Sequence, residues 1–202
     1  TLDDQAETVL LGLARGHFPA GVLADSVVQD LHAFMLERCK PYLRDQGFAA
    51  DEVDAVLSLS PTRLDQLRPR LTALQGFRAL PEAEALAAAN KRIRNILRQA
   101  GNLATGNVDP ALLKEPAEQH LARELDARRA EVEPLFARAD YSGALKRLAA
   151  LRPAVDAFFD QVLVMAEDVQ VRHNRLALLS SLSQLFLGAA DISRLQTRQS
   201  RV

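Results

Sequence analysis

Cysteine, aromatic residues and long apolar runs are scarce in this 202-residue chain. Cys39 is the only cysteine, which excludes an internal disulfide framework and a cysteine-based zinc site, and favours a reducing compartment. No run approaches the roughly 18 consecutive apolar residues that suggest a membrane span, and the first residues lack the basic-then-apolar order of a secretory signal. We therefore expect a cytoplasmic protein without a membrane segment. Because the chain begins at Thr1 rather than Met, we also expect it to be part of a longer protein.

The chain has no marked excess of charge of either sign. Its 25 Lys and Arg residues face 26 Asp and Glu residues, giving a formal net charge of −1. Such a surface cannot bind phosphates indiscriminately, so any nucleic-acid contact requires a local basic patch. Hydrophobic residues make up 48% of the chain, enough to bury a sizeable core in one domain or in two small lobes.

Patterns typical of β-strands are nearly absent, whereas apolar residues recur at helical spacing almost throughout. The sequence therefore predicts an all-α fold, a bundle of about seven to nine helices. Asp51 and Ser60 are expected to cap two of them, and residues 194–202 are expected to fray. Glycine, proline and capping residues predict helices at roughly 2–14, 24–44, 51–57, 60–77, 81–100, 110–138, 141–151, from 153 onward, and 168–188.

Residues 101–107 form the most loop-like stretch of the chain. We predict a boundary there between an N-terminal helical lobe, residues 1–101, which contains a basic helix at 82–100, and a C-terminal helical lobe, residues 102–202. The two lobes are expected to pack together as one unit.

The common catalytic motifs are missing. The sequence has no Gly-rich phosphate loop, no GxSxG elbow and no HExxH pair, and its four His residues do not recur at metal-ligand spacing. Acidic residues such as Asp51 and Glu52 are expected to act as helix caps or to lie on solvated faces. We therefore predict neither a catalytic residue nor a metal site in this chain.

The most informative helix is AANKRIRNILRQA, residues 88–100. On a helical wheel, Lys91, Arg94, Asn95 and Arg98 fall at i, i+3, i+4 and i+7, with Arg92 on their flank, whereas the apolar residues gather opposite. We call these five residues the cationic stripe. No acidic residue lies between Glu84 and Asp109 to offset the charge. The stripe suits a phosphate backbone, because arginine binds phosphate bidentately and stacks on unpaired bases. The alternative is an ordinary solvated helix face.

A second group of chemically informative residues lies between 155 and 179. Arg175 shares a helix side with Leu178 and Leu182, so its charge needs a partner, and Asp156, Asp160 or Asp191 is expected to provide it. Phe158 and Phe159 point about 100° apart on a helix, so one of them can stay partly exposed unless two core elements enclose both. An exposed aromatic beside a cationic stripe is typical of proteins that stack single-stranded bases.

At these segments the sequence resembles the C-terminal region of the β subunit of bacterial tetrameric glycyl-tRNA synthetases, which carries a DALR-type anticodon-binding domain. The strings AANKRIRNIL and VDAFFDxVxVMAED are highly specific for that family. The resemblance is carried by these strings together with four others, and the six cover most of the chain in the expected order: FMLERCKPYL (34–43), DEVDAVLS (51–58), LRPRLTALQGF (67–77) and RHNRLALLSSLSQLFLGAADISRLQ (172–196). Cys39 departs from the aliphatic residue expected there, and is expected to be a small buried hydrophobe.

The resemblance implies a helical domain that binds the anticodon region of tRNA-Gly, and it implies the remainder of the β subunit and an α subunit in an α2β2 tetramer as partners. Class II aminoacylation, with ATP and Mg, would take place on the α subunit, so this chain alone would need no cofactor and have no activity. By position, the residues implied to bind tRNA are the cationic stripe together with Arg172, Asn174 and Arg175 at the start of the final long helix. For Arg175, the wheel favours the structural ion pair.

A different class of function stays open. If the helices carry more apolar surface than the core buries, the exposed remainder would instead predict a helical protein-interaction module without RNA contact.

Overall fold

The computed structural model describes residues 13, 16–19, 22, 24–101 and 106–196. The described residues contain helices and no β-strand, so the predicted all-α class is confirmed. The predicted helix at 2–14, apart from residue 13, and residues 197–202 of the tail predicted to fray lie outside the described residues. Residues 194–196 of that tail are instead held by backbone hydrogen bonds, including the Gln196 N–H to Asp51 at 2.9 Å, so the predicted fraying is wrong for them. The α-helices are α2 (Val27–Asp45), α3 (Ala50–Leu57), α4 (Leu67–Arg78), α5 (Ala83–Ala100), α6 (Pro116–Ala137), α7 (Tyr141–Ala149), α8 (Arg152–Gln161) and α9 (Val169–Leu187). Short 3-10 turns are η1 (Leu64–Gln66), η3 (Pro110–Leu112) and η4 (Ile192–Arg194).

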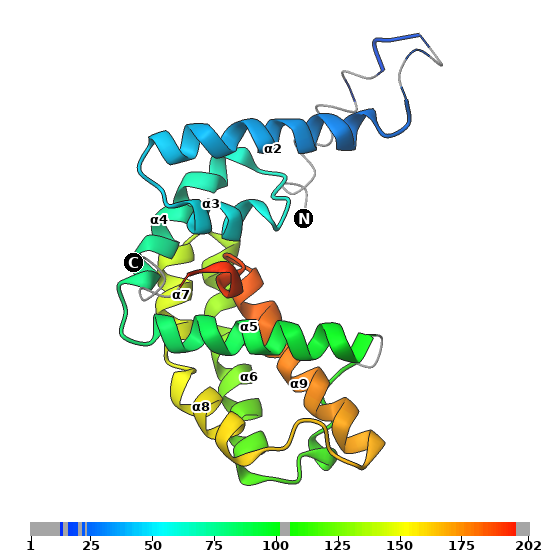
Figure 1. Ribbon diagram of the computed structural model, residues 1–202, viewed down its shortest axis with the longest axis vertical. Helices are drawn as coiled ribbons and strands as arrows, with labels where there is room; N and C mark the ends of the chain where they lie inside the picture. Colours follow the sequence, from blue (N-terminus) through cyan, green and yellow to red (C-terminus); the bar gives the residue numbers. More distant parts are fainter. Residues whose placement is uncertain (1–12, 14–15, 20–21, 23, 102–105, 197–202) are drawn as a thin grey trace.

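The helices form an elongated body (Figure 1). Helix α2 crosses one end above α3, α5 crosses the middle, and α6, α8 and α9 extend toward the other end. Helix α4 packs against α7, and α6 packs against α7 and α8. Helix α5 packs against α8, α9 and η4, so it lies at the centre of the fold.

One continuous apolar core holds these helices together. Its largest fully buried side chains include Phe77, Phe158 and Phe186, and the rings of Phe77 and Phe186 meet edge to face with centroids 6.2 Å apart. Such edge-to-face pairs add to the free energy gained by burying the rings. Cys39, expected to be buried, is only partly buried where it packs against this core.

Helix starts follow the capping chemistry of the sequence only in part. Asp168 caps α9 by accepting the N–H groups of Gln170 and Val171 at 2.8 and 3.2 Å, as the predicted start at 168 requires. The predicted cap at Asp51 is wrong, because α3 starts after Ala49 and the carboxylate of Glu52 accepts the Ala49 N–H at 2.9 Å.

Two further predicted helix starts come too early in the chain. Ser60 adopts a left-handed backbone with φ of 48°, and α4 begins seven residues later, after η1. Asp109 and Pro110 open only the 3-10 turn η3, and α6 begins at Pro116, where the proline occupies the first helical position.

The predicted boundary at 101–107 falls after α5, and residues 102–105 lie outside the described part of the chain. Helix α5 nevertheless packs closely on α8 and α9, which follow the boundary. The division into 1–101 and 102–202 therefore stays a prediction, while the basic helix 82–100 corresponds to α5.

Candidate nucleic-acid interface

The cationic stripe lies on the outward side of α5. Leu86 and Ile93 are fully buried on the opposite side of this helix, where they face the core. The five stripe residues are all exposed, as the helical wheel predicted: Lys91, Arg92, Arg94, Asn95 and Arg98. Because the core fixes the rotation of α5, the stripe is held toward solvent without needing any contact of its own.

Only one cation of the stripe is offset by a carboxylate among the described residues. Arg94 pairs with Asp191 and also donates to the hydroxyl of Ser193 at 3.2 Å, although its side chain is still 46% exposed. Arg98 donates to the amide oxygen of Asn95 at 3.2 Å, which leaves its charge intact. Within the described part of the chain, Lys91, Arg92 and Arg98 thus keep charges available to an anion.

An aromatic ring lies directly beside the stripe. The guanidinium of Arg92 lies over the ring of Phe159, 4.2 Å from its centroid. Phe158 is fully buried and meets Phe159 edge to face at 5.5 Å, while Phe159 is only partly buried. Of the two alternatives that the sequence left open, the structure thus has one ring partly exposed, and it brings the two sequence segments together at this point.

Asp191 anchors the turn η4 between α3 and α5. Its buried carboxylate accepts hydrogen bonds from Arg94, from Arg194 at 3.0 Å and from the Ser193 hydroxyl at 2.6 Å. Its backbone N–H donates to the carbonyl of Ala55 in α3 at 2.9 Å. Asp191 thus pairs with the stripe rather than with Arg175.

Arg194 is a cation near the stripe that the sequence analysis missed, because it was assigned to the fraying tail. The i, i+3 spacing of Asp191 and Arg194 was the only signal in the sequence. Arg194 and Lys91 line a groove of about 630 Å³ between α3, α5 and η4, with Asp54 on its other wall. Arg194 is paired with Asp191, and Asp51 also lines the groove, so Lys91 is the groove cation without a carboxylate partner among the described residues.

The start of α9 differs from expectation. Asn174 is buried, and its amide donates to the carbonyl of Asp109 at 3.0 Å and accepts the Asp109 N–H at 2.7 Å. Both ends of this amide are therefore occupied, and the expectation that it contacts tRNA is corrected. Arg172 is partly buried and donates to the carbonyl of Ala166 at 2.9 Å. Its role at an RNA surface stays a prediction.

Arg175 forms the buried ion pair that the helical wheel predicted, but with a different partner. It pairs with Glu118 of α6, whose side chain is fully buried. Two of the three predicted partners, Asp156 and Asp160, are exposed, and Asp156 contacts Arg152 at 3.4 Å. Glu118 lies 57 residues before Arg175, and only the packing of α6 against α9 brings them together.

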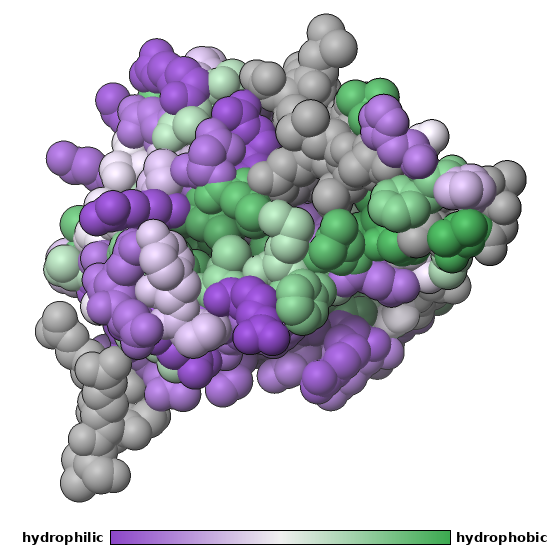
Figure 2. Space-filling model, turned by 90° about the horizontal axis from the view of Figure 1, so that it is seen from above, coloured by the Kyte–Doolittle hydropathy of each residue, from purple (hydrophilic) through white to green (hydrophobic). Residues whose placement is uncertain are grey.

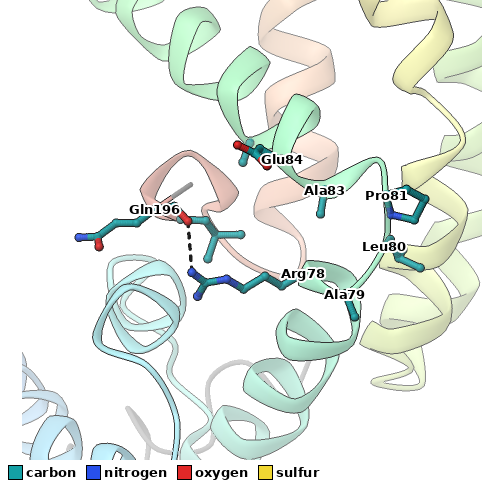
Figure 3. Close-up of a pocket in the computed structure, with 9 residues that line it drawn as sticks. Arg78, Ala79, Leu80, Pro81, Ala83, Glu84 and Gln196 are labelled. Atoms are coloured by element: carbon teal, nitrogen blue, oxygen red, sulfur yellow. Dashed lines mark hydrogen bonds between the residues drawn. The ribbon is translucent and has the colours of Figure 1, made fainter. Parts of the chain in front are cut away.

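A separate cavity of about 240 Å³ lies between the end of α4, the start of α5 and the segment after η4 (Figure 3). Arg78 borders it and donates to the carbonyl of Gln196 at 3.1 Å, to Asp51 at 3.1 Å and to Glu52 at 3.3 Å. Asp51 and Glu52, expected to be helix caps or to lie on solvated faces, are buried, and only Glu52 contributes to capping α3.

The charge of Asp51 is stabilised by its partners. Burial alone would raise the pKa of this carboxyl, but the Gln196 N–H at 2.9 Å and the Arg78 guanidinium outweigh burial and hold the pKa below its ordinary 3.8. Burial alone would lower the pKa of Arg78, but the carboxylates of Asp51 and Glu52 outweigh burial and raise it. The groups around this cavity therefore tie the segment after η4 to α3 and α4.

Neither a metal site nor a membrane span is found in the described residues. No three His, Cys, Asp or Glu side chains there come together in a way that could hold an ion. None of the described helices combines the length and apolarity needed to cross a bilayer.

The fold and the exposed basic helix agree with what comparison with known families finds. The family described as DALR anticodon binding domain matches residues 86–193, which extend from α5 to η4 and make up more than half of the chain. The chain therefore belongs to the DALR anticodon-binding domain family. The matched residues include all four cations of the stripe: Lys91, Arg92, Arg94 and Arg98.

The curated relatives that the chain matches carry the name glycine–tRNA ligase β subunit. The protein of that name from Pasteurella multocida is 50% identical over 171 residues, covering 85% of this chain and 25% of the relative. The one from Leptothrix cholodnii is 49% identical over 187 residues, covering 92% and 26%, and the one from Janthinobacterium sp. is 51% identical over 162 residues, covering 80% and 23%. The chain thus spans about a quarter of the length of these relatives.

Proposed function

We propose that this chain is the tRNA-binding part of a glycine–tRNA ligase β subunit and that it recognises the anticodon region of tRNA-Gly through the cationic stripe. The observation that supports this most directly is the charge of Lys91, Arg92 and Arg98, which is exposed and lacks a carboxylate partner in the described part of the chain. Membership of an anticodon-binding family makes RNA the natural source of the matching phosphates.

The roles within the interface follow from side-chain chemistry. Lys91 and Arg98 neutralise phosphates and so position the tRNA without reading its sequence. Arg92, supported from below by Phe159, offers a planar group on which an unpaired base can stack. Asn95 is the uncharged member of the stripe, and its amide can hydrogen-bond to a base edge.

In this proposal, the ligase reaction takes place outside this chain. ATP-dependent glycylation, with Mg, takes place on the α subunit of an α2β2 enzyme in the cytoplasm, and this chain alone has no catalytic activity. The sequence has no Gly-rich phosphate loop, and no three His, Cys, Asp or Glu side chains among the described residues come together to hold an ion such as Mg. Its partners are tRNA-Gly, the remainder of the β subunit and the α subunit.

A fluorescence titration with labelled tRNA tests the proposal. We expect tRNA-Gly to bind more tightly than a noncognate tRNA, and a tRNA-Gly with a substituted anticodon to lose that advantage. Equal binding of all three RNAs would reduce the interface to generic electrostatics and contradict anticodon recognition.

One observation favours a second function, a protein-interaction module without RNA contact. Several large apolar side chains on α2 are exposed, more than a monomeric helical domain requires. Absence of any tRNA binding in the titration would leave this alternative. The same exposed side chains of α2 can also contact protein while α5 binds tRNA.

A further inference from the structure

The outward side of α2 carries large apolar side chains in solvent. Leu31, Phe34 and Tyr42 are 42, 54 and 62% exposed, and the guanidinium of Arg38 lies over the Phe34 ring, 5.0 Å from its centroid. At about 100° per residue, these four positions fall within roughly 80° of one another on the helix. We call them the α2 face. Figure 2 views the molecule from the α2 end and shows apolar surface extending across it.

The α2 face is not the side by which this helix joins the core. Leu36 and Leu43 are buried and point toward α3, on the opposite side of α2. Leu31 and Phe34 therefore lie on a different side of α2 from the buried Leu43, so this helix has two apolar sides. Leu36 and Leu43 join α2 to the core, so the α2 face is available for another contact.

The charges on α2 do not fit an RNA partner. The helix carries three acidic residues and three basic ones: Asp30, Glu37, Asp45, Arg38, Lys40 and Arg44. Lys40 is further offset by an ion pair with Glu37 at 2.6 Å. Phosphate binding requires an excess of cations, as on α5, whereas a balanced helix with exposed aromatic and aliphatic side chains fits an apolar protein surface.

The size of the α2 face indicates what kind of protein contact it makes. Leu31 and Tyr42 are eleven residues apart, about 17 Å along a helix that is about 10 Å wide, so the footprint is roughly 170 Å². A stable complex of separate chains buries about 800 Å² on each partner. A contact of this size is too small to hold a second copy but sufficient within one polypeptide, where the linkage supplies a high effective concentration.

We propose that the α2 face docks on an apolar surface in the part of the β subunit that lies outside this chain. The relatives supply the length for such a partner, since this chain spans about a quarter of them. Docking joins the α2 end of the molecule to the rest of the subunit. This end lies far from α8 and from the tip of α9, and docking there leaves α5 facing solvent. The inference rests on the chain being part of a β subunit and needs no tRNA, so it can fail independently of anticodon binding.

Hydroxyl-radical footprinting of the full-length β subunit tests the proposal, with peptide mass spectrometry as the readout. The two tyrosines of this chain form an internal comparison, because Tyr42 is 62% exposed and Tyr141 is 3% exposed without the rest of the subunit. With the α2 face docked, Tyr42 should be oxidised at a rate within about two-fold of Tyr141. Oxidation of Tyr42 at least ten-fold faster than Tyr141 would overturn the proposal.

Other occupants give different patterns, each of which contradicts the proposal. Protection of Tyr42 that grows with the concentration of the β subunit indicates a second copy. Protection that requires added α subunit or added tRNA indicates those partners instead.

A paired variant in the full-length β subunit supplies the second measurement. L31D/F34D should undock the face and raise Tyr42 oxidation at least five-fold, whereas A33D, at an exposed position on another side of α2, should leave it unchanged. An unchanged rate in L31D/F34D would overturn the proposal. If that variant does not fold, the comparison of Tyr42 with Tyr141 in the wild type decides alone.

Discussion

Replacing Glu118 by Gln tests how the start of α6 is held against α9. The carboxylate is fully buried and accepts three hydrogen bonds: from Arg175, and from the backbone N–H groups of Lys114 and Glu115 at 2.7 and 3.0 Å. Arg175 also donates to the carbonyl of Leu163 at 2.7 Å, so the same pair supports the loop between α8 and α9. The pair of Glu118 and Arg175 therefore connects the start of α6, helix α9 and the loop between α8 and α9.

The cost of E118Q follows from this geometry. A Gln side chain offers one acceptor oxygen and one NH2 donor, so in either orientation its NH2 faces a donor that the carboxylate had satisfied. Arg175, also buried, keeps its charge with only the Leu163 carbonyl. Removing one partner of a buried pair costs about 3–5 kcal/mol, a large part of the roughly 5–15 kcal/mol that stabilises a domain.

Urea unfolding followed by circular dichroism at 222 nm measures this cost. We expect E118Q to lower the free energy of unfolding by about 3–5 kcal/mol, and E118Q/R175M to recover at least about 1 kcal/mol because the stranded charge is gone. E124Q is the control, since Glu124 makes only a long ion pair of 3.7 Å with Arg128, worth about 0–1 kcal/mol. A loss in E118Q no larger than in E124Q would refute the reasoning.

Two further predictions concern Asp51 and Arg92. The pKa of Asp51 is lowered in the folded state, so its charge stabilises the protein above the ordinary pKa of 3.8, and that contribution is lost as the pH falls through the folded value. D51N should therefore lower the free energy of unfolding at pH 7 by about 2 kcal/mol. In urea titrations, the difference in this free energy between D51N and wild type should shrink below pH 3.8. A difference that stays constant with pH would contradict this. R92K keeps the charge but loses the planar group over Phe159, so tRNA affinity should fall about ten-fold with an unchanged salt dependence. A change in the salt dependence without that fall in affinity would contradict base stacking.

Features determined by local periodicity could be predicted from the sequence. The spacing of the apolar residues in 88–100 gave the rotation of α5, and the structure leaves every residue of the cationic stripe exposed as that rotation requires. Asp168 likewise signalled the start of α9, because a cap acts on N–H groups only two and three residues away. Both inferences depend on contacts within one helix.

Features determined by contacts between helices could not be predicted. Arg175 was expected to need a carboxylate, but the choice of Glu118 over Asp156 depends on how α6 packs against α9. Asn174 looks like any polar residue in sequence, and only the fold places its amide against the backbone of Asp109. Arg194 was missed for the same reason, since nothing local places η4 beside α5.

The salt dependence of tRNA-Gly binding tests the central claim most directly, with K91A/R98A compared with wild type. Each phosphate contact in a single-stranded region contributes about 0.7 to the slope of log affinity against log salt concentration, so losing two should reduce the slope by about 1.4 and weaken binding at low salt. K146A/R123A, which removes two exposed cations from α7 and α6, should leave the slope unchanged. A folded K91A/R98A protein with wild-type affinity and slope would contradict the assignment of the cationic stripe to tRNA.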